Sequence, residues 1–156
     1  MKEKKISDEK GRVATILLVE DDEEDRWGTK RAFAKSHLRN KLMAVENGEE
    51  ALDYLYHRGD FEDVNEYPSP DLILLDLNLP IMDGRSVLLK IKGDPNLRLI
   101  PVVVLTTSRQ EEDILRSYDL GVNSYISKPI DFDKFTKMVT EMGNYWFELV
   151  VLPPKR

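Results

Sequence analysis

Cysteine is absent from this chain of 156 residues. A protein without thiols has no disulfide framework and no thiolate metal site, which is typical of a reducing compartment. Long apolar runs are missing as well. None approaches the ~18 residues that a transmembrane helix needs, and residues 1–15 contain no apolar signal core. The sequence therefore predicts a cytoplasmic protein that does not enter a membrane.

Positive charge is in the minority, with 23 Lys and Arg against 29 Asp and Glu and a formal net charge of -6. Proteins that follow a nucleic-acid backbone neutralise its phosphates with clustered basic residues. We therefore expect no nucleic-acid partner.

The length and the 41% share of hydrophobic residues are those of one domain with a sizeable core. Residues 1–14 are polar and mixed in charge, and we interpret them as a flexible lead-in. We predict one folded domain over residues 15–149 and a short C-terminal tail over residues 150–156.

Short apolar runs alternate with segments of helical periodicity. The runs predict five buried strands, at residues 15–19, 41–45, 72–75, 100–105 and 123–126. Apolar residues at helical spacing predict a helix after each strand, at residues 23–38, 49–57, 85–92, 108–121 and from 132 onwards. The apolar stripe of the first of these helices is Trp27, Phe33, Ala34 and Leu38. Because strands and helices alternate five times, we predict an α/β fold, a doubly wound five-stranded parallel sheet with helices on both faces.

Chemically useful residues follow four of the five runs. Glu20 and Asp21 follow the first, Asp76 follows the third, and Thr106 and Lys128 follow the last two. Alone, each residue type has an ordinary explanation, such as a helix cap, a packed hydroxyl or a solvated charge. A doubly wound sheet, however, brings the carboxyl ends of its strands into one crevice. Their joint occurrence therefore predicts a single site.

Three carboxylates and one ammonium leave this predicted site with an excess of negative charge, which a divalent cation would remove. Mg²⁺ fits best, because it accepts one or two carboxylates and retains waters that a phosphoryl oxygen can replace. Mn²⁺ is the alternative. We predict that Asp21 and Asp76 bind the metal directly, that Glu20 acts through water, and that the backbone carbonyl of Asn78 completes the ligands.

A site of this kind supports phosphoryl transfer to Asp76. The loose transition state of that reaction needs positioning and charge neutralisation more than covalent help. The metal and Lys128 would neutralise charge, and the Thr106 hydroxyl would hydrogen-bond a phosphoryl oxygen. Asp76 is the predicted nucleophile.

Four motifs at these positions resemble the receiver domain of two-component response regulators. They are LLVEDD at residues 17–22, LLDLNLPIMDG at 74–84, VVVLTTS at 102–108 and YISKP at 125–129. The resemblance implies a flavodoxin-like receiver fold with strand order 2-1-3-4-5. It makes Glu20 and Asp21 the acidic pair, Asp76 the phosphoacceptor and Lys128 the phosphate partner.

The same resemblance implies how the site responds to phosphorylation. Thr106 is the switch hydroxyl, and Tyr125 is the aromatic switch residue that turns inward. Asn78 and Ser108 occupy the two positions that tune hydrolysis of the phosphoryl group. The bond before Pro129 is expected to be cis, which proline tolerates.

Within this family the chain is similar to the standalone regulators that partner bacterial phytochrome-type histidine kinases. The similar features are the long polar loop at residues 58–70, IPVVVLTTS at 100–108, SYDLGVNSYI at 117–126 and GNYWFELVVLPP at 143–154. The resemblance implies a single-domain regulator that a sensor histidine kinase phosphorylates and that then binds another protein. It would be no enzyme beyond catalysing its own phosphorylation and dephosphorylation. The downstream partner and the role of the loop stay open.

Three other classes of protein fit the chain less well. A haloacid-dehalogenase-like phosphatase needs a second Asp where the chain has Asn78. A flavin-binding protein of this topology needs a Ser-, Thr- and Gly-rich phosphate loop where the chain has Glu20, Asp21 and Asp22. A pseudo-receiver that serves only as a protein-interaction module stays the alternative, although the complete set of site residues argues against it.

The last predicted helix carries a wide apolar stripe of Phe135, Met138, Val139, Met142, Trp146 and Leu149. Core packing explains such a stripe, but its C-terminal part continues past the predicted sheet. Exposed apolar patches of this kind mark interfaces. We therefore hypothesise a homodimer through the last helix, the last strand and the C-terminal tail.

Overall fold

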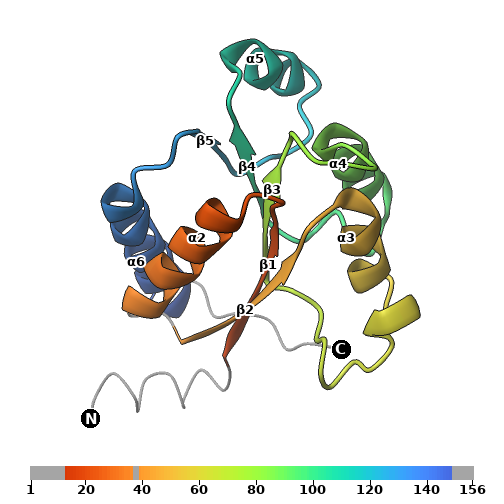
Figure 1. The fold of residues 1–156 in the computed structure, drawn as a ribbon, viewed down its shortest axis with the longest axis horizontal. Coiled ribbons are helices and arrows are strands. Elements are labelled where there is room, and N and C mark those ends of the chain that lie inside the picture. Colours follow the sequence, from red (N-terminus) through yellow and green to blue (C-terminus); the bar gives the residue numbers. More distant parts are fainter. Residues whose placement is uncertain (1–12, 37–38, 149–156) are drawn as a thin grey trace.

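The computed structural model describes residues 13–36 and 39–148. Its strands form one parallel sheet in the order β2-β1-β3-β4-β5 (Figure 1). The strands are β1 (Ala14–Val19), β2 (Asn40–Val45), β3 (Leu72–Asp76), β4 (Val102–Thr106) and β5 (Ser124–Ser127). The predicted α/β fold and the implied strand order are confirmed.

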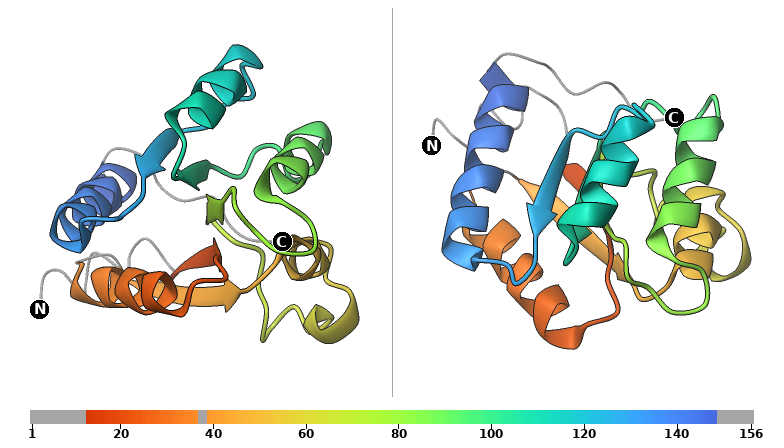
Figure 2. Two further views of the ribbon diagram at one scale, coloured as in Figure 1. Left: turned by 45° about the horizontal axis from the view of Figure 1, so that its top comes forward. Right: turned by 90° about the horizontal axis from the view of Figure 1, so that it is seen from above.

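Helices cover both faces of the sheet. They are α2 (Glu23–Lys35), α3 (Gly48–Leu55), α4 (Gly84–Gly93), α5 (Arg109–Ser117) and α6 (Phe132–Glu148), with a 3₁₀ turn η1 (Gly59–Phe61) after α3. Figure 2 shows α2 and α6 side by side on one face, with α3 and α4 on the other. The sheet is therefore the middle of three layers.

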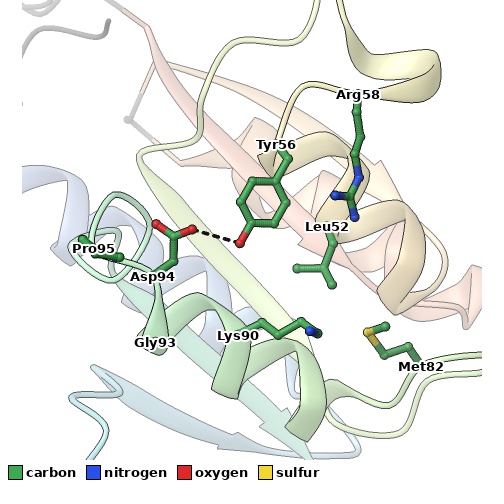
Figure 3. A pocket seen from close by; sticks show the side chains of 8 residues that line it. All are labelled: Leu52, Tyr56, Arg58, Met82, Lys90, Gly93, Asp94 and Pro95. Carbon is green, nitrogen blue, oxygen red and sulfur yellow. Dashed lines mark hydrogen bonds between the residues drawn. The ribbon is translucent and has the colours of Figure 1, made fainter.

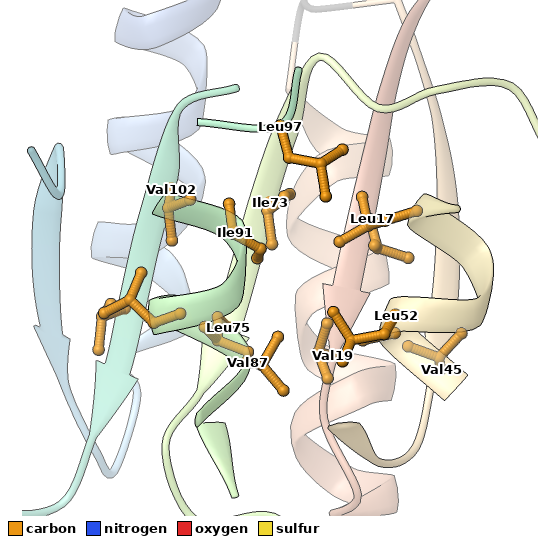
Figure 4. Packing of buried hydrophobic residues seen from close by; sticks show 14 of the residues in the cluster. Leu17, Val19, Val45, Leu52, Ile73, Leu75, Val87, Ile91, Leu97 and Val102 are labelled. Carbon is orange, nitrogen blue, oxygen red and sulfur yellow. The ribbon is translucent and has the colours of Figure 1, made fainter. Parts of the chain in front are cut away.

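Each face of the sheet has its own apolar cluster. Ile16 and Leu18 of β1 pack with Phe33 and Phe135 on the side of α2 and α6. On the side of α3 and α4, the cluster is formed around Leu17, Val19, Leu52, Ile73, Leu75, Val87 and Ile91 (Figure 4). Successive strand residues point to opposite faces and both faces are covered, so β1, β3 and β4 are apolar nearly throughout. The polar residues therefore lie mainly at the ends of these strands.

The buried face of α2 differs from the prediction. Trp27, expected in the apolar stripe, is 62% exposed, and Ala34 is exposed as well. The face toward the core consists of Gly28, Thr29, Ala32 and Phe33. A Cβ atom at Gly28 would collide with the ring of Phe132, so the close approach of α6 leaves no space there for a large side chain. Trp27 lies outside, with the guanidinium carbon of Arg31 5.2 Å from its ring centroid.

The sequence overestimated the length of two helices. α3 ends at Leu55 rather than His57, whose φ of 54° is left-handed. α5 ends at Ser117 rather than near Gly121, since Asp119 and Gly121 have φ of 51° and 76°. Left-handed residues of this kind follow the end of a helix.

The long loop at residues 58–70 packs against α3. Its Phe61 and Tyr67 rings lie 5.4 and 5.9 Å, centroid to centroid, from the ring of Tyr54. Tyr54 is fully buried, and its hydroxyl donates a 2.8 Å hydrogen bond to the Pro68 carbonyl. Burial raises the pKa of Tyr54 above its ordinary value. The loop is therefore anchored to the core and is not slack chain.

Several predictions fall outside the described part of the chain. Residues 1–12 and 150–156 belong to the predicted lead-in and tail, so the domain boundaries stay predictions. The homodimer hypothesis depends on the side chains of Met142, Trp146 and Leu149, which are also outside it. Phe135 and Val139, at the start of the same stripe, are core residues. Among the described residues, no helix has the length and apolar character needed to span a membrane.

Candidate functional site

Two carboxylates are fixed at the carboxyl edge of the adjacent strands β1 and β3. Glu20 directly follows β1, and Asp76 is the last residue of β3. The apolar strands carry both into buried positions, with Glu20 0% and Asp76 2% exposed, while Asp21 is exposed. One oxygen from each of the three carboxylates lies within 4.8 Å of the other two. The structure thus brings together the three acids that the sequence predicted to share a site.

Hydrogen bonds hold the loop between β1 and α2. Arg26 Nη1 donates to the backbone carbonyls of Glu20 and Asp21, at 3.2 and 3.0 Å. Asp22 caps α2, because its side chain accepts a 3.1 Å hydrogen bond from the Asp25 N–H. Glu20 Oε2 accepts from the N–H of Asp22 at 3.2 Å. These contacts fix where the acidic side chains leave the backbone.

Lys128 reaches the same site from the end of β5. Its backbone N–H donates to the Thr106 carbonyl at 2.9 Å, which continues the pairing of β4 with β5. Its ammonium nitrogen lies 2.7 Å from Glu20 Oε1, 3.0 Å from Asp25 Oδ2 and 3.0 Å from Asp76 Oδ2. A single cation therefore contacts three carboxylates.

Asp25 is the one member of this group that the sequence did not predict. In the helix predicted over residues 23–38, Asp25 falls in the first turn, where the macrodipole favours acids and no further role is needed. Six consecutive acids at residues 20–25 gave no reason to choose one of them. Asp25 lies three residues after the helix cap Asp22, at the end of the helix nearest the carboxyl ends of the strands. That position is the signal from which Asp25 could have been predicted.

The donor set suits an oxygen-seeking divalent cation. Glu20, Asp25 and Asp76 contact one ammonium, and Asp21 lies beside Glu20 and Asp76, so acidic groups outnumber the cation. Glu20 Oε1 is buried and has no partner with hydrogen-bond geometry, although Lys128 Nζ is close enough for an ion pair. Hard cations such as Mg²⁺ bind carboxylate oxygens of this type.

The electrostatics of the site shift two pKa values. Burial, followed by the neighbouring Asp76, raises the pKa of Glu20 from 4.5 to about 8. For Lys128, burial alone would lower the pKa. Its contacts with Glu20, Asp76 and Asp25 outweigh burial and raise it. Without a metal, the site therefore holds a proton on Glu20 at neutral pH and keeps Lys128 charged.

We expect the raised pKa of Glu20 to make stability fall with pH. A carboxyl with a higher pKa in the folded state binds its proton more tightly there, so folding is favoured below pH 4.5 and loses this advantage as pH rises to about 8. Chemical denaturation without divalent ions should show the free energy of unfolding falling by about 2 kcal/mol from pH 6 to pH 8. Glu20→Gln should remove this decrease. An equal pH dependence in both proteins would contradict the assignment.

Thr106 ends β4, the strand that pairs with β3, and hydrogen-bonds with Ser108, while Asn78 contacts Asp76 itself. The Thr106 hydroxyl accepts from the Ser108 N–H at 3.0 Å and lies 3.2 Å from the Ser108 carbonyl, to which it donates. The N–H of Asn78 donates to Asp76 Oδ1 at 3.0 Å, and its side-chain amide donates to the Thr107 hydroxyl at 3.0 Å. Ser108 Oγ caps α5. The Asn78 carbonyl as a metal ligand and the tuning of hydrolysis stay predictions.

Tyr125 is half-buried on β5, next to α5. The guanidinium carbon of Arg116 lies 4.3 Å from its ring centroid, and Arg116 Nε forms an ion pair with Glu112 Oε2 at 2.9 Å. Burial raises the pKa of the Tyr125 hydroxyl. The bond between Lys128 and Pro129 is cis, as the resemblance implied.

An open groove between α3 and α4 lies apart from this site (Figure 3). It has a volume of about 660 Å³ and is lined by Leu52, Tyr56, Arg58, Met82, Lys90, Gly93, Asp94 and Pro95. The Tyr56 hydroxyl donates to Asp94 Oδ2 at 2.9 Å across it. None of the predicted site residues lines this groove.

The fold and this strand-edge site define the class of the protein. Residues 16–140 match the family model of the response regulator receiver domain. The chain therefore belongs to the response regulator receiver domain family, whose members accept a phosphoryl group, bind a divalent metal and are generally not metabolic enzymes.

Particular relatives are similar over nearly the whole chain. Response regulator Rcp1 of Synechocystis sp. is 43% identical over 148 residues, which are 95% of this chain and 99% of that protein. The crystal structure of the phosphorylated cyanobacterial phytochrome response regulator RcpA is 43% identical with a TM-score of 0.76, covering 92% of this chain and 100% of that one. The Mn²⁺-bound form of Rcp1 is 42% identical with a TM-score of 0.75, covering 90% of this chain and 99% of that one.

Proposed function

We propose that this response regulator accepts a phosphoryl group on Asp76 from a sensor histidine kinase of the phytochrome type, in a Mg²⁺-dependent reaction in the cytoplasm. The observation that supports the proposal best is the arrangement around Asp76. One oxygen of this buried carboxylate contacts Lys128 at 3.0 Å, and two further carboxylates lie within 4.8 Å. The similarity to phytochrome response regulators supports the choice of kinase.

In the proposed reaction, a carboxylate oxygen of Asp76 forms the new bond to phosphorus as the bond from phosphorus to the donor's leaving atom breaks. Asp76 attacks as a carboxylate, so it has no proton to lose. Lys128 donates hydrogen bonds to the incoming oxygens and offsets their charge. The N–H of Asn78 holds the attacking carboxyl in position. In this proposal the protein catalyses its own phosphorylation and dephosphorylation and no other reaction.

Glu20, Asp21 and Asp76 would hold the cation, which supplies charge neutralisation on the transferring phosphoryl group. The proton on Glu20 must leave before its carboxylate can act on the cation, which we expect it to do through water. Binding should therefore be weaker below about pH 8, the pKa of this carboxyl. Mg²⁺ is the proposed ion, with Mn²⁺ as the alternative.

The direct test is incubation with acetyl phosphate, followed by intact mass. Wild type should gain one phosphoryl group with Mg²⁺ and none with a chelator. Asp76→Asn should gain none, whereas Asp113→Asn, which changes an exposed acid on α5, should behave as wild type. A wild type that never gains mass would support the pseudo-receiver that acts only by binding.

The phosphorylated protein would signal by binding a partner. We propose that the Thr106 hydroxyl leaves Ser108 for a phosphoryl oxygen, and that Tyr125 then moves away from Arg116 and inward. The surfaces of α5, β5 and α6 would change together. A homodimer through α6, β5 and the tail stays part of this proposal, and sedimentation with and without phosphorylation tests it.

A further inference from the structure

Three carboxyl groups share the ammonium of Lys128 in this structure. An ammonium carries three N–H groups, and Lys128 Nζ has three carboxylate oxygens at 2.7 to 3.0 Å, from Glu20, Asp25 and Asp76. A phosphoryl group on Asp76 adds oxygens that need a donor from the same ammonium. The phosphoryl oxygens then compete with these three carboxyl groups for the same ammonium.

The three partners differ in how easily water can replace Lys128. The side chains of Glu20 and Asp76 are 0% and 3% exposed, whereas that of Asp25 is 22% exposed. A buried polar group that loses its partner bears the cost of its missing solvation, because water cannot replace the lost contact. Asp25 can be hydrated instead. It is therefore the contact that is released most easily.

Local structure explains why Asp25 is aimed at Lys128. Asp22 is the cap of α2 and Asp25 is its third residue, which often bonds back to the N–H of the cap residue. Here Glu20 Oε2 accepts from that N–H at 3.2 Å. The Asp25 carboxylate is left to bind Lys128 across the site.

We propose that Asp25 is a positioning residue that restrains Lys128 in the unphosphorylated protein and competes with the phosphoryl group for it. The inference rests on the proposed function of Asp76. The negative charge of Asp25 also opposes the approach of an anionic donor. Both effects act in the same direction, because each makes phosphorylation slower than the rest of the site allows.

The test is the rate of phosphorylation by acetyl phosphate at saturating Mg²⁺, followed by intact mass. Asp25→Asn removes the charge at constant size, and the reaction should be about fivefold faster, the factor that corresponds to one nearby charge at high dielectric. Asp25→Ala should be faster as well, and Asp25→Glu should return the rate toward that of wild type. The gain should shrink at high ionic strength, because Asp25 is partly exposed.

Glu24→Gln is the matched control. Glu24 is an exposed acid in the same helical turn and is not one of the three ion-pair partners of Lys128. Its rate should stay within about twofold of wild type, since an exposed charge contributes little. An Asp25→Asn rate equal to that of Glu24→Gln would overturn the proposal, and so would a slower one. The proposed function is tested separately: it stands, whatever the Asp25 variants do, if wild type gains a phosphoryl group and Asp76→Asn does not.

Discussion

Lys128→Ala is expected to lower the free energy of unfolding by about 3 kcal/mol at pH 8, because removing one partner of a buried ion pair leaves the others uncompensated. The Lys128 side chain is 10% exposed and lies within 3.0 Å of three carboxylates, so its loss affects all of them. Urea denaturation of the metal-free protein measures the change. Acid should reduce the loss, since protonated carboxyls no longer need the cation.

Two further variants separate the effect of the lost ion pairs from the effect of removing any lysine. Lys137→Ala, at an exposed position on α6, should change stability by less than about 0.5 kcal/mol. Adding Glu20→Gln to Lys128→Ala should recover part of the lost stability, because it removes one of the unpaired charges. Equal effects at Lys128 and Lys137 would show that the ion pairs carry little stability.

Gly84→Ala is expected to cost about 3 kcal/mol, which is large for a single added methyl group. A Cβ atom at Gly84 would meet backbone atoms: it would overlap the Asp76 carbonyl and lie 2.6 Å from the Leu77 Cα. The same backbone holds the hydrogen bond from the Gly84 N–H to the Leu77 carbonyl at 3.0 Å. The substitution should also displace Asp76 and slow its phosphorylation.

The other end of the same helix provides the control. Gly93 ends α4, and a Cβ atom there meets no described atom within 4 Å. Gly93→Ala should raise the free energy of unfolding by about 0.5 kcal/mol, because alanine loses less backbone entropy on folding. Thermal or urea denaturation measures the free energy of unfolding of both variants relative to wild type. Similar effects at the two glycines would contradict the role assigned to close packing at Gly84.

The sheet and the strand-edge residues could be predicted because they depend on local patterns. Strands buried on both faces are apolar nearly throughout, and β3 ends where the first carboxylate appears, at Asp76. Parallel strands then bring Glu20, Asp76 and Lys128 to one edge by topology alone. The family motifs lie at the same positions, which is why fold and family agree with the structure.

Other features depend on contacts between distant segments. Asp25 is aimed at Lys128 only because the cap of α2 and the end of β5 meet, and no local pattern records that meeting. Trp27 was placed in the core because it is apolar, but the ring of Phe132 already fills the space beside Gly28. The sequence of α2 alone does not contain this information.

The anchored loop at residues 58–70 determines where the chain can be lengthened or shortened in engineering. Phe61 and Tyr67 pack on each other, with ring centroids 5.0 Å apart, and both pack on Tyr54. A deletion that removes either ring would open a cavity beside a fully buried tyrosine. The exposed residues 62–66 between the two rings are the natural place to graft a reporter peptide.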